Sequence, residues 1–433
     1  MSYSKIDFGS DTEMTWDDNG IHGRRSILPG GLRVLTEHIP GQHSAAVSFW
    51  IGAGSRDETA GHEGSTHFLE HLLFKGTPTR SAVQISEESD FIGSGLNAAT
   101  ARTSTDYHGR VFSEDLPTLV DLLADMITSP RLDAKDMELE RGVILEELSS
   151  SDDDAEDVAA NAMLLSVMGD HPVARPIGGT QEIVSALAHS SMREHYRDYY
   201  KPSELVITAA GDVDHDELCA LAVDRLTAGG WDLTGEAKSA DRRRYPKVTY
   251  SEATVEHREH PSQQAQVSVG MPGLAVADDD EFAAYSLALI LGGGASSRLF
   301  QEVRERRGLA YSAYAWSMLA EEGGLFAMDA ACAPEKAEEV ARIMGECLDD
   351  IAANGVTQRE VDSAFNQRRT ALTFRMETNT FRRNRLGRSE LGRGELFSAE
   401  EQLRLAREVT AEDIRRVAQR LASGPRSMVF VGA

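Results

Sequence analysis

The chain has 433 residues, which is more than one ordinary hydrophobic core supports, so we expect two or three domains. Hydrophobic residues make up 41% of the chain and charged residues 26%, without a long biased tract, which indicates a folded protein. The 70 acidic residues outnumber the 44 basic ones, and the formal charge of −26 repels nucleic acids and anionic lipid surfaces. We therefore expect neither a nucleic-acid partner nor a membrane partner.

Cysteine usage and the N-terminal sequence predict a cytoplasmic location. Cys219, Cys332 and Cys347 are an odd number without CxxC spacing, and they lie in apolar segments, which is typical of reduced, buried thiols. The first 20 residues are acidic and contain no apolar segment of the kind that secretory signals have. No stretch approaches the roughly 18 apolar residues of a membrane span.

The predicted elements of the first half begin with a buried strand at 44–54 and a helix at about 65–75. Cap-like Ser65 and Thr66 begin this helix, and a stop signal follows it at Gly76 and Pro78. Further along we predict a helix at 81–92, strands at 96–100 and 105–112, helices at 116–127 and 136–148, more helices to about 200, a strand at 204–211 and a helix at 215–226.

Residues 228–246 lose this periodicity and collect glycine, proline and mixed charge, so we interpret them as a linker. Beyond the linker the order of elements returns, with a strand at 264–272, a helix at 281–293, strands between 311 and 331, a helix at 337–351 and a long helix from about 357. Both halves also close alike, with a helix, a short polar turn and a buried strand.

This repetition predicts an α+β fold of two similar domains that arose by internal duplication, each with a mostly antiparallel sheet flanked by helices. The predicted N-terminal domain spans 1–227, the linker 228–246 and the C-terminal domain 247–433.

The sequence HFLEH in the first helix is the strongest chemical signal of the chain. His67 and His71 are four residues apart, which places both imidazoles on one face of a helix at a distance that suits one Zn²⁺. Glu70 lies beside them and could act as a general base, and the HxxEH order is that of the inverzincin peptidases. The alternative is a pair of surface histidines on an apolar helix.

A catalytic zinc has three protein ligands and one open position, so a third ligand must come from elsewhere. Glu147 is the candidate, on a helix where Glu140 lies two turns earlier on the same face. Glu146 points about 100° away from Glu147 in a regular helix, so only one of the two can face the metal.

Four motifs together resemble the pitrilysin and insulinase family of zinc metallopeptidases, in its shorter form. They are HFLEHLLFKGT, LNAATARTSTDY, ERGVILEEL and SSRLFQEVRERRGLAYS, and the resemblance covers nearly the whole chain. It implies two domains that form a clamshell around a chamber. It also implies that His67, His71 and Glu147 bind zinc and that Glu70 is the base. Glu140 would support the site, although a solvated carboxylate on a helix face is the alternative.

The resemblance also implies substrate contacts. Asn97 and Ala98 match the strand beside the zinc to which an extended peptide adds, whereas the residues alone are equally typical of a turn. Arg304 and Tyr311 match a pair in the second domain, and Tyr311 would bond the oxyanion of the tetrahedral intermediate. Without the resemblance, Arg304 is a solvated charge and Tyr311 a core strand residue.

These observations predict a zinc metalloendopeptidase with one Zn²⁺ per chain, which hydrolyses extended peptides or unfolded polypeptides as a homodimer. One alternative is a catalytically silent structural subunit of a heteromeric processing peptidase. Another is a catalytic subunit that requires a different, inactive partner chain. The second half has no HxxEH, so only one repeat is expected to hold metal.

Overall fold

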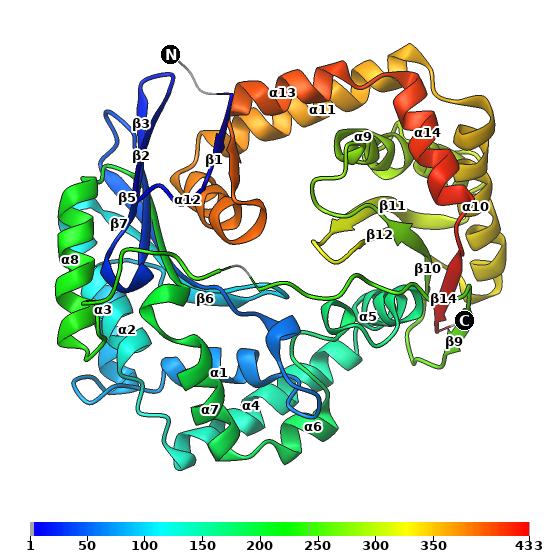
Figure 1. Ribbon diagram of the computed structural model, residues 1–433. Helices are drawn as coiled ribbons and strands as arrows, with labels where there is room; N and C mark the ends of the chain where they lie inside the picture. The colour runs from blue at the N-terminus through cyan, green and yellow to red at the C-terminus, as the bar shows by residue number, and fades with distance from the viewer. Residues whose placement is uncertain (1–3, 242, 433) are drawn as a thin grey trace. The chain divides into compact units, whose positions relative to one another are not determined.

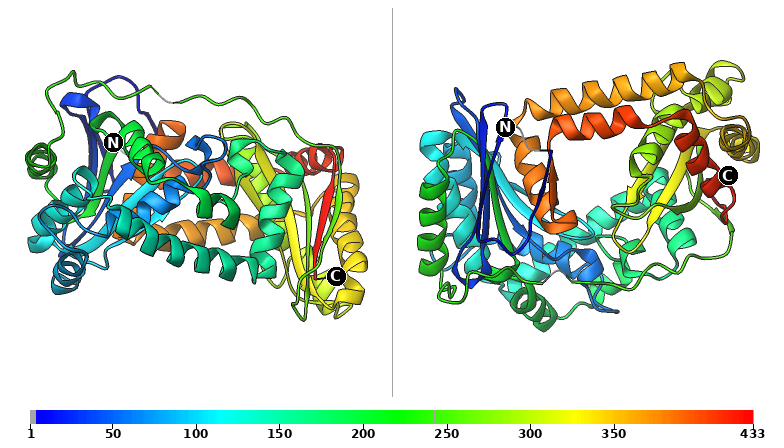
Figure 2. Two further views of the ribbon diagram at one scale, coloured as in Figure 1. Left: turned by 90° about the horizontal axis from the view of Figure 1, so that it is seen from below. Right: turned by 45° about the horizontal axis from the view of Figure 1, so that its top comes forward.

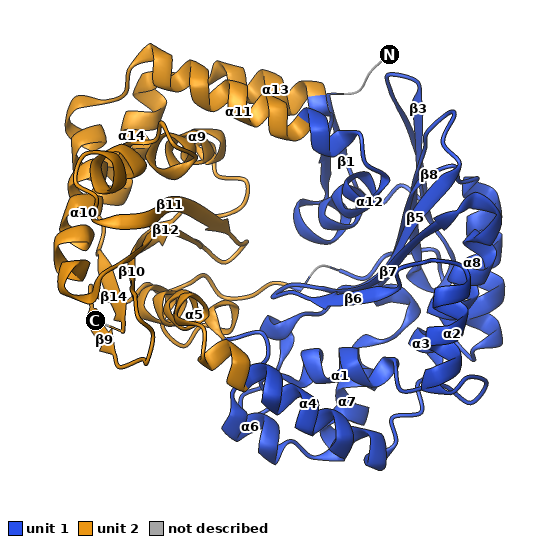
Figure 3. Ribbon diagram, turned by 180° about the vertical axis from the view of Figure 1, so that it is seen from behind, with its two compact units in different colours: residues 1–148, 176–243, 373–399 blue, residues 149–175, 244–372, 400–433 orange. Residues whose placement is uncertain are grey.

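The computed structural model describes residues 4–241 and 243–432 (Figure 1, Figure 2). The chain divides into two compact units (Figure 3). Unit 1 comprises residues 1–148, 176–243 and 373–399, and unit 2 comprises residues 149–175, 244–372 and 400–433. Each unit has its own sheet and its own hydrophobic core, so the α+β class predicted from the sequence is confirmed.

Unit 1 is built on a sheet with the strand order β2-β3-β4-β8-β5-β7-β6. Strands β4 and β8 are parallel, and the other neighbouring pairs are antiparallel. The strands are β2 (Glu13–Asp18), β3 (Ile21–Ile27), β4 (Arg33–His38), β5 (Ser44–Ile51), β6 (Asn97–Thr100), β7 (Thr105–Phe112) and β8 (Leu205–Gly211). Within the described residues β6 is the last strand, so one of its edges has no strand partner.

Helices cover both faces of this sheet, because successive side chains of a strand point to opposite sides. In β5, Val47 and Phe49 join the main core of unit 1, whereas Trp50 packs in a second cluster with Leu386. Figure 1 shows α3 and α8 on one side of the sheet and α12 on the other. The bounds of these helices are α3 (Leu116–Thr128), α8 (His215–Ala228) and α12 (Asn379–Arg388).

Unit 2 has a sheet with the order β11-β12-β10-β14-β9. Its strands are β9 (Val255–Arg258), β10 (Ala265–Gly273), β11 (Ala310–Leu319), β12 (Gly324–Cys332) and β14 (Ser427–Val431). Taken from the β9 end, this order and the strand directions equal those of β4-β8-β5-β7-β6 in unit 1. Both series start with a parallel pair and continue antiparallel, which supports the predicted internal duplication.

The two units exchange one helix each. Helix α5 (Ala155–Met168), from the first half of the chain, packs on β10 and β14 of unit 2 (Figure 2). Helix α12, from the second half, packs on β4, β5 and β8 of unit 1. The other face of the unit 2 sheet packs against α9 (Glu281–Gly292), α10 (Ala337–Asn354) and α14 (Ala411–Ala422).

This exchange makes the compact units differ from the predicted domains 1–227 and 247–433. Residues 149–175 belong to unit 2 and residues 373–399 to unit 1, because α5 and α12 bury apolar faces on the opposite sheets. The predicted linker 228–246 contains the boundary at 243 and, after α8 ends, has neither helix nor strand in its described part. Its residue 242 lies outside the described residues.

The helices and strands expected from the sequence occur at the predicted positions, with shifts of a few residues at their ends. The remaining helices include α1 (Ser65–Leu73), α2 (Ala82–Phe91), α4 (Ala134–Asp152), α6 (Gln181–Ala186), α7 (His189–Tyr199), α11 (Gln358–Met376) and α13 (Ala399–Glu408). In the described part of the chain, no helix has both the length and the hydrophobicity that a membrane crossing needs.

Candidate metal centre

Helix α1 presents two different faces. Phe68, Leu69 and Leu72 are buried in the core of unit 1, whereas His67 and His71 retain exposed surface on the opposite side. The buried carboxylate of Glu58 accepts hydrogen bonds from the backbone N–H groups of Gly64 at 2.9 Å and Thr66 at 2.7 Å. These groups belong to the first turn, which has no intrahelical acceptors, so Glu58 fixes the start of the helix.

Three side chains meet above this helix in a geometry that suits one metal ion. The Nε2 atoms of His67 and His71 are 3.3 Å apart. A carboxylate oxygen of Glu147 lies 3.9 Å from Nε2 of His67 and 3.5 Å from Nε2 of His71. Tetrahedral Zn²⁺ with ligand bonds of about 2.0–2.1 Å requires ligand atoms roughly 3.3–3.4 Å apart. The two imidazoles and one carboxylate therefore fit zinc in donor chemistry and in spacing.

The protonation of the two histidines also suits a metal. Burial and, to a smaller extent, the neighbouring His71 lower the pKa of His67 to about 4, so the imidazole is neutral near pH 7. Nδ1 of His71 lies 3.2 Å from a buried carboxylate oxygen of Glu140. A proton on this Nδ1 leaves the lone pair of Nε2 directed at the cluster, which is the usual arrangement of a metal-binding histidine.

Helix α4 supplies both acidic residues of the centre. Glu140 is buried, and its second carboxylate oxygen lies 2.5 Å from the ammonium group of Lys75. Glu147 is half exposed, which leaves solvent access to the centre. Glu146 is exposed and is not part of the group of possible metal ligands found among the described residues, as the helical geometry predicts.

Glu70 connects the helix to the edge strand β6. The hydroxyl of Thr100, the last residue of β6, donates a hydrogen bond of 2.5 Å to the carboxylate of Glu70. Burial raises the pKa of Glu70, and the Thr100 hydrogen bond partly opposes this shift. A carboxylate with a raised pKa is a stronger base than an ordinary glutamate, so its place beside the metal centre suits it to accept and return a proton.

Asn97 and Ala98 begin this edge strand. They pair with His108 and Tyr107 of β7, which excludes the alternative that they form only a turn. The side-chain oxygen of Asn97 accepts a hydrogen bond from the backbone N–H of Ala98 at 2.9 Å. The strand therefore has an ordered backbone with one open edge, and its far end touches Glu70.

Arg304 and Tyr311 belong to unit 2 and lie together. The guanidinium carbon of Arg304 is 4.9 Å from the ring centroid of Tyr311 and 4.7 Å from that of Phe300. Tyr311 has an exposed fraction of 73%, so it is not the core strand residue that its position in an apolar segment suggests. The structure thus gathers the other predicted site residues in unit 1 and this pair in unit 2.

Comparison with known proteins agrees with the fold and the cluster. Residues 33–181 match the family model described as insulinase, peptidase family M16, and residues 186–368 match the model of the peptidase M16 inactive domain. An uncharacterized zinc protease of Mycobacterium tuberculosis is 43% identical over 401 residues, which cover 92% of this chain and 91% of that protein. An uncharacterized zinc protease of Bacillus subtilis is 30% identical over 94% of this chain and 98% of that protein.

Two solved structures share the fold at low sequence identity. A protease from Helicobacter pylori has a TM-score of 0.86 and 21% identity, and covers 95% of this chain and 99% of its own. A peptidase M16 inactive domain from Pseudomonas fluorescens has a TM-score of 0.84 and 19% identity over 97% of each chain. The relatives that match nearly the whole chain are named zinc proteases, which supports a peptidase class. The chain belongs to the insulinase family, peptidase family M16.

Sequence reasoning did not single out two residues that support the centre. Lys75 contacts Glu140, and Thr100 contacts Glu70. A signal for Lys75 was its spacing of four from His71, which continues the ligand face of the helix. Thr100 gave no independent signal, because its contact with α1 depends on how β6 lies against the helix.

Proposed function

We propose that this chain is a zinc metalloendopeptidase that hydrolyses extended or unfolded polypeptides. The observation that carries the proposal is the convergence of His67, His71 and Glu147, with ligand atoms 3.3–3.9 Å apart, beside Glu70 on the same helix. The names of the relatives as zinc proteases support the same reading.

In this proposal His67, His71 and Glu147 hold one Zn²⁺ per chain. The ion, when bound, supplies Lewis acidity toward the scissile carbonyl and makes water in the site more acidic. Glu70 accepts the proton of the attacking water as its oxygen bonds to the carbonyl carbon. Glu70 then gives this proton to the amine nitrogen as the C–N bond breaks. Thr100 orients the Glu70 carboxylate for both transfers.

The open edge of β6 supports an extended substrate. A peptide that adds to this edge as a strand bonds through its backbone, which accepts many sequences and requires the segment to be unfolded. The contact between Thr100 of this strand and Glu70 supports cleavage of a bond close to the edge. Asn97 and Ala98 would then contact the substrate backbone. Arg304 and Tyr311 are proposed to assist, with Tyr311 donating to the oxyanion.

A catalytically silent subunit is the weaker alternative, because the three ligand candidates and Glu70 are all present in this chain. The same completeness favours a homodimer over a catalytic subunit that needs an inactive partner. The homodimer and the cytoplasmic location stay predictions. Light scattering tests the former, and a monomer or a requirement for a distinct partner chain would contradict it.

The test is hydrolysis of an unstructured, internally quenched fluorescent peptide by the purified protein. We expect cleavage at internal bonds, loss of cleavage after treatment with a chelator, and recovery on addition of about one equivalent of Zn²⁺ per chain. A compact folded protein, offered as a control, should resist cleavage until it is unfolded. Cleavage that survives complete removal of metal would contradict the proposal.

A further inference from the structure

The turn that follows helix α1 is held by a polar cluster outside the metal centre. The helix ends at Leu73, and Gly76 forms an antiparallel bridge with Ser81. The backbone N–H of Thr77 donates to the carbonyl of Arg80 at 2.8 Å, which closes the turn. Gly76 has φ of 116°, and a Cβ there would lie 2.7 Å from the carbonyl oxygen of Arg80, so the turn accepts only glycine at this point.

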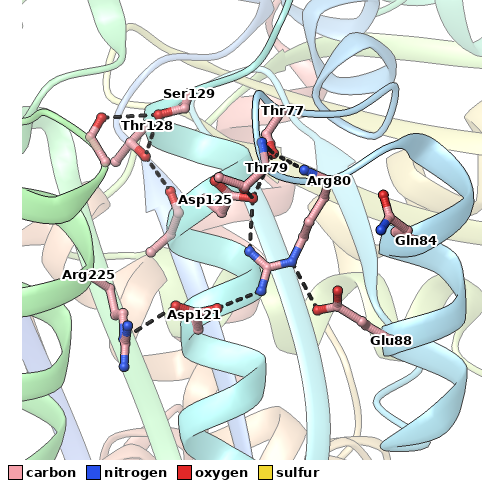
Figure 4. Close-up of polar contacts among 12 residues, drawn as sticks. Thr77, Thr79, Arg80, Gln84, Glu88, Asp121, Asp125, Thr128, Ser129 and Arg225 are labelled. Atoms are coloured by element: carbon pink, nitrogen blue, oxygen red, sulfur yellow. Dashed lines mark hydrogen bonds and ion pairs between the residues drawn. The ribbon is translucent and has the colours of Figure 1, made fainter.

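Arg80 lies at the centre of this cluster, between α2 and α3 (Figure 4). Its guanidinium donates to Glu88 at 2.9 Å, to Asp121 at 2.6 Å and to Asp125 at 2.9 Å. The side chain is 17% exposed, so these charge-assisted bonds are partly shielded from solvent. The hydroxyl of Thr77 also donates to Asp125, at 2.7 Å. The turn is therefore tied to both helices.

The same turn leads directly to the metal centre. Lys75, between the helix and the turn, contacts Glu140 at 2.5 Å, and Glu140 contacts Nδ1 of His71 at 3.2 Å. The carbonyl of Lys75 accepts a hydrogen bond of 2.7 Å from the side chain of Arg131. The orientation of the His71 ring thus depends on Glu140. The position of Lys75, which pairs with Glu140, depends in turn on the position of the turn at 76–81.

We propose that Arg80 is a positioning residue for the metal centre, an inference that rests on the proposed zinc site. Removal of the guanidinium leaves the carboxylate of Glu88 on α2 close to those of Asp121 and Asp125 on α3 without their shared cation. Their repulsion moves α2 away from α3, and the turn that precedes α2 moves with it. Lys75 moves with the turn and loosens its contact with Glu140. The result is a metal centre with weaker affinity and altered ligand geometry, although no ligand has changed.

The experiment compares zinc affinity and the visible absorption of the Co²⁺-substituted protein in matched variants. For Arg80→Gln we expect zinc affinity to fall by about 10-fold or more, because the loss of an outer-shell partner typically lowers metal affinity by about 10–100-fold. We also expect the Co²⁺ absorption bands to change. Arg80→Lys keeps the charge but reaches fewer carboxylates, so it should fall between Arg80→Gln and the unaltered protein. This milder variant decides the matter if Arg80→Gln does not fold.

Two controls separate positioning from general stability. Arg225, on α8, forms an ion pair with Asp121, with 3.3 Å between Nε and the carboxylate oxygen. Among the contacts of the described residues, Arg225 has none with the turn. Arg225→Gln should therefore leave zinc affinity and the Co²⁺ bands unchanged. Leu218→Ala removes a core side chain of α8 and lowers stability without touching the cluster. It should also leave both readouts unchanged.

The outcomes are distinct. Failure of the unaltered protein to bind zinc would overturn the proposed function itself. Zinc binding by the unaltered protein with equal affinity and equal Co²⁺ bands in both Arg80 variants would overturn only the positioning role. Equal losses in Leu218→Ala would also overturn it, because the effect would then follow stability.

Discussion

The two units share a core of five strands in the same order, yet among the described residues only unit 1 holds a group of side chains that could bind a metal. In unit 1, α1 buries one face and leaves His67, Glu70 and His71 on the other. In unit 2, α9 is apolar and buried over most of its surface. The duplicated fold therefore provides a scaffold, and the candidate metal centre depends on the few residues placed on α1 and α4.

Individual buried carboxylates of the two units also differ in their hydrogen-bond partners. In unit 1, Glu37 lies 3.0 Å from Arg382, and Glu390 receives two bonds of 2.9 Å from Arg25. In unit 2, the buried Asp329 receives hydrogen bonds from Ser268 and Trp316. Burial raises the pKa of Asp329 to about 6, because these neutral donors compensate its charge less than an arginine does.

The largest expected effect tests the chemistry assigned to unit 1. Glu70→Gln keeps the shape of the side chain but removes its ability to take and return a proton. We expect peptidase activity to fall by about 10²–10⁴-fold while zinc content stays at one per chain. Steady-state kinetics on the quenched peptide and metal analysis of the same sample check this. Near-normal turnover in Glu70→Gln would remove Glu70 from the mechanism.

The next effect tests whether unit 2 contributes to catalysis at all. Tyr311→Phe should lower kcat far more than it raises KM, at a cost of about 2.7–4 kcal/mol if Tyr311 acts as a full oxyanion donor. Tyr314→Phe, on the same strand, is the matched control, because the Tyr314 hydroxyl already donates to Glu156 at 2.5 Å. An unchanged kcat in Tyr311→Phe would confine the catalytic residues to unit 1.

A smaller effect concerns the support of His71. Glu140→Gln weakens the hydrogen bond that orients the ring, so we expect zinc affinity to fall by about 10–100-fold. Competition with a chromophoric chelator measures this change. If zinc affinity is unaltered, Glu140 is only a buried partner of Lys75. The supporting role at the metal centre that the family resemblance implies would then be wrong.

The smallest effect concerns the stability of unit 2. The pKa of Asp329 is raised from 3.8 to about 6, so the folded state holds this proton more tightly, and stability falls as pH rises from about 4 to 6. Asp329→Asn should not show this loss of stability, because asparagine has no carboxyl proton to release. Relative to the variant, the unaltered protein should lose about 1–1.5 kcal/mol between pH 5 and pH 8. Urea unfolding at both pH values measures the difference, and parallel pH profiles would contradict the account.

Much of the fold follows from local patterns in the sequence. The spacing of His67 and His71 fixes their common face, because it needs only a helix. The approach of Glu147 could be proposed only from ligand number and family likeness, since it depends on how α4 packs beside α1. The hairpin of β2 and β3 was missed because its strands are polar, although Asn19 and Gly20, both at positive φ, carry the signal of a tight hairpin turn.

The exchange of α5 and α12 between units could not be predicted in the same way. Both helices have an apolar face, but that pattern does not state which sheet covers it. Each helix could pack on either face of either of the two related sheets, and the face that it covers is decided by the tertiary structure. The contacts of Lys75 and Thr100 have the same origin, because each joins elements that are distant in the chain.

Metal analysis of Glu147→Gln beside Glu146→Gln tests the central claim most directly. The two substitutions are chemically identical and adjacent, but only Glu147 lies within reach of both histidines. The account predicts about one Zn²⁺ per chain in Glu146→Gln and loss of zinc with loss of peptidase activity in Glu147→Gln, because two histidines alone leave the centre one ligand short. Full zinc occupancy in Glu147→Gln would contradict it.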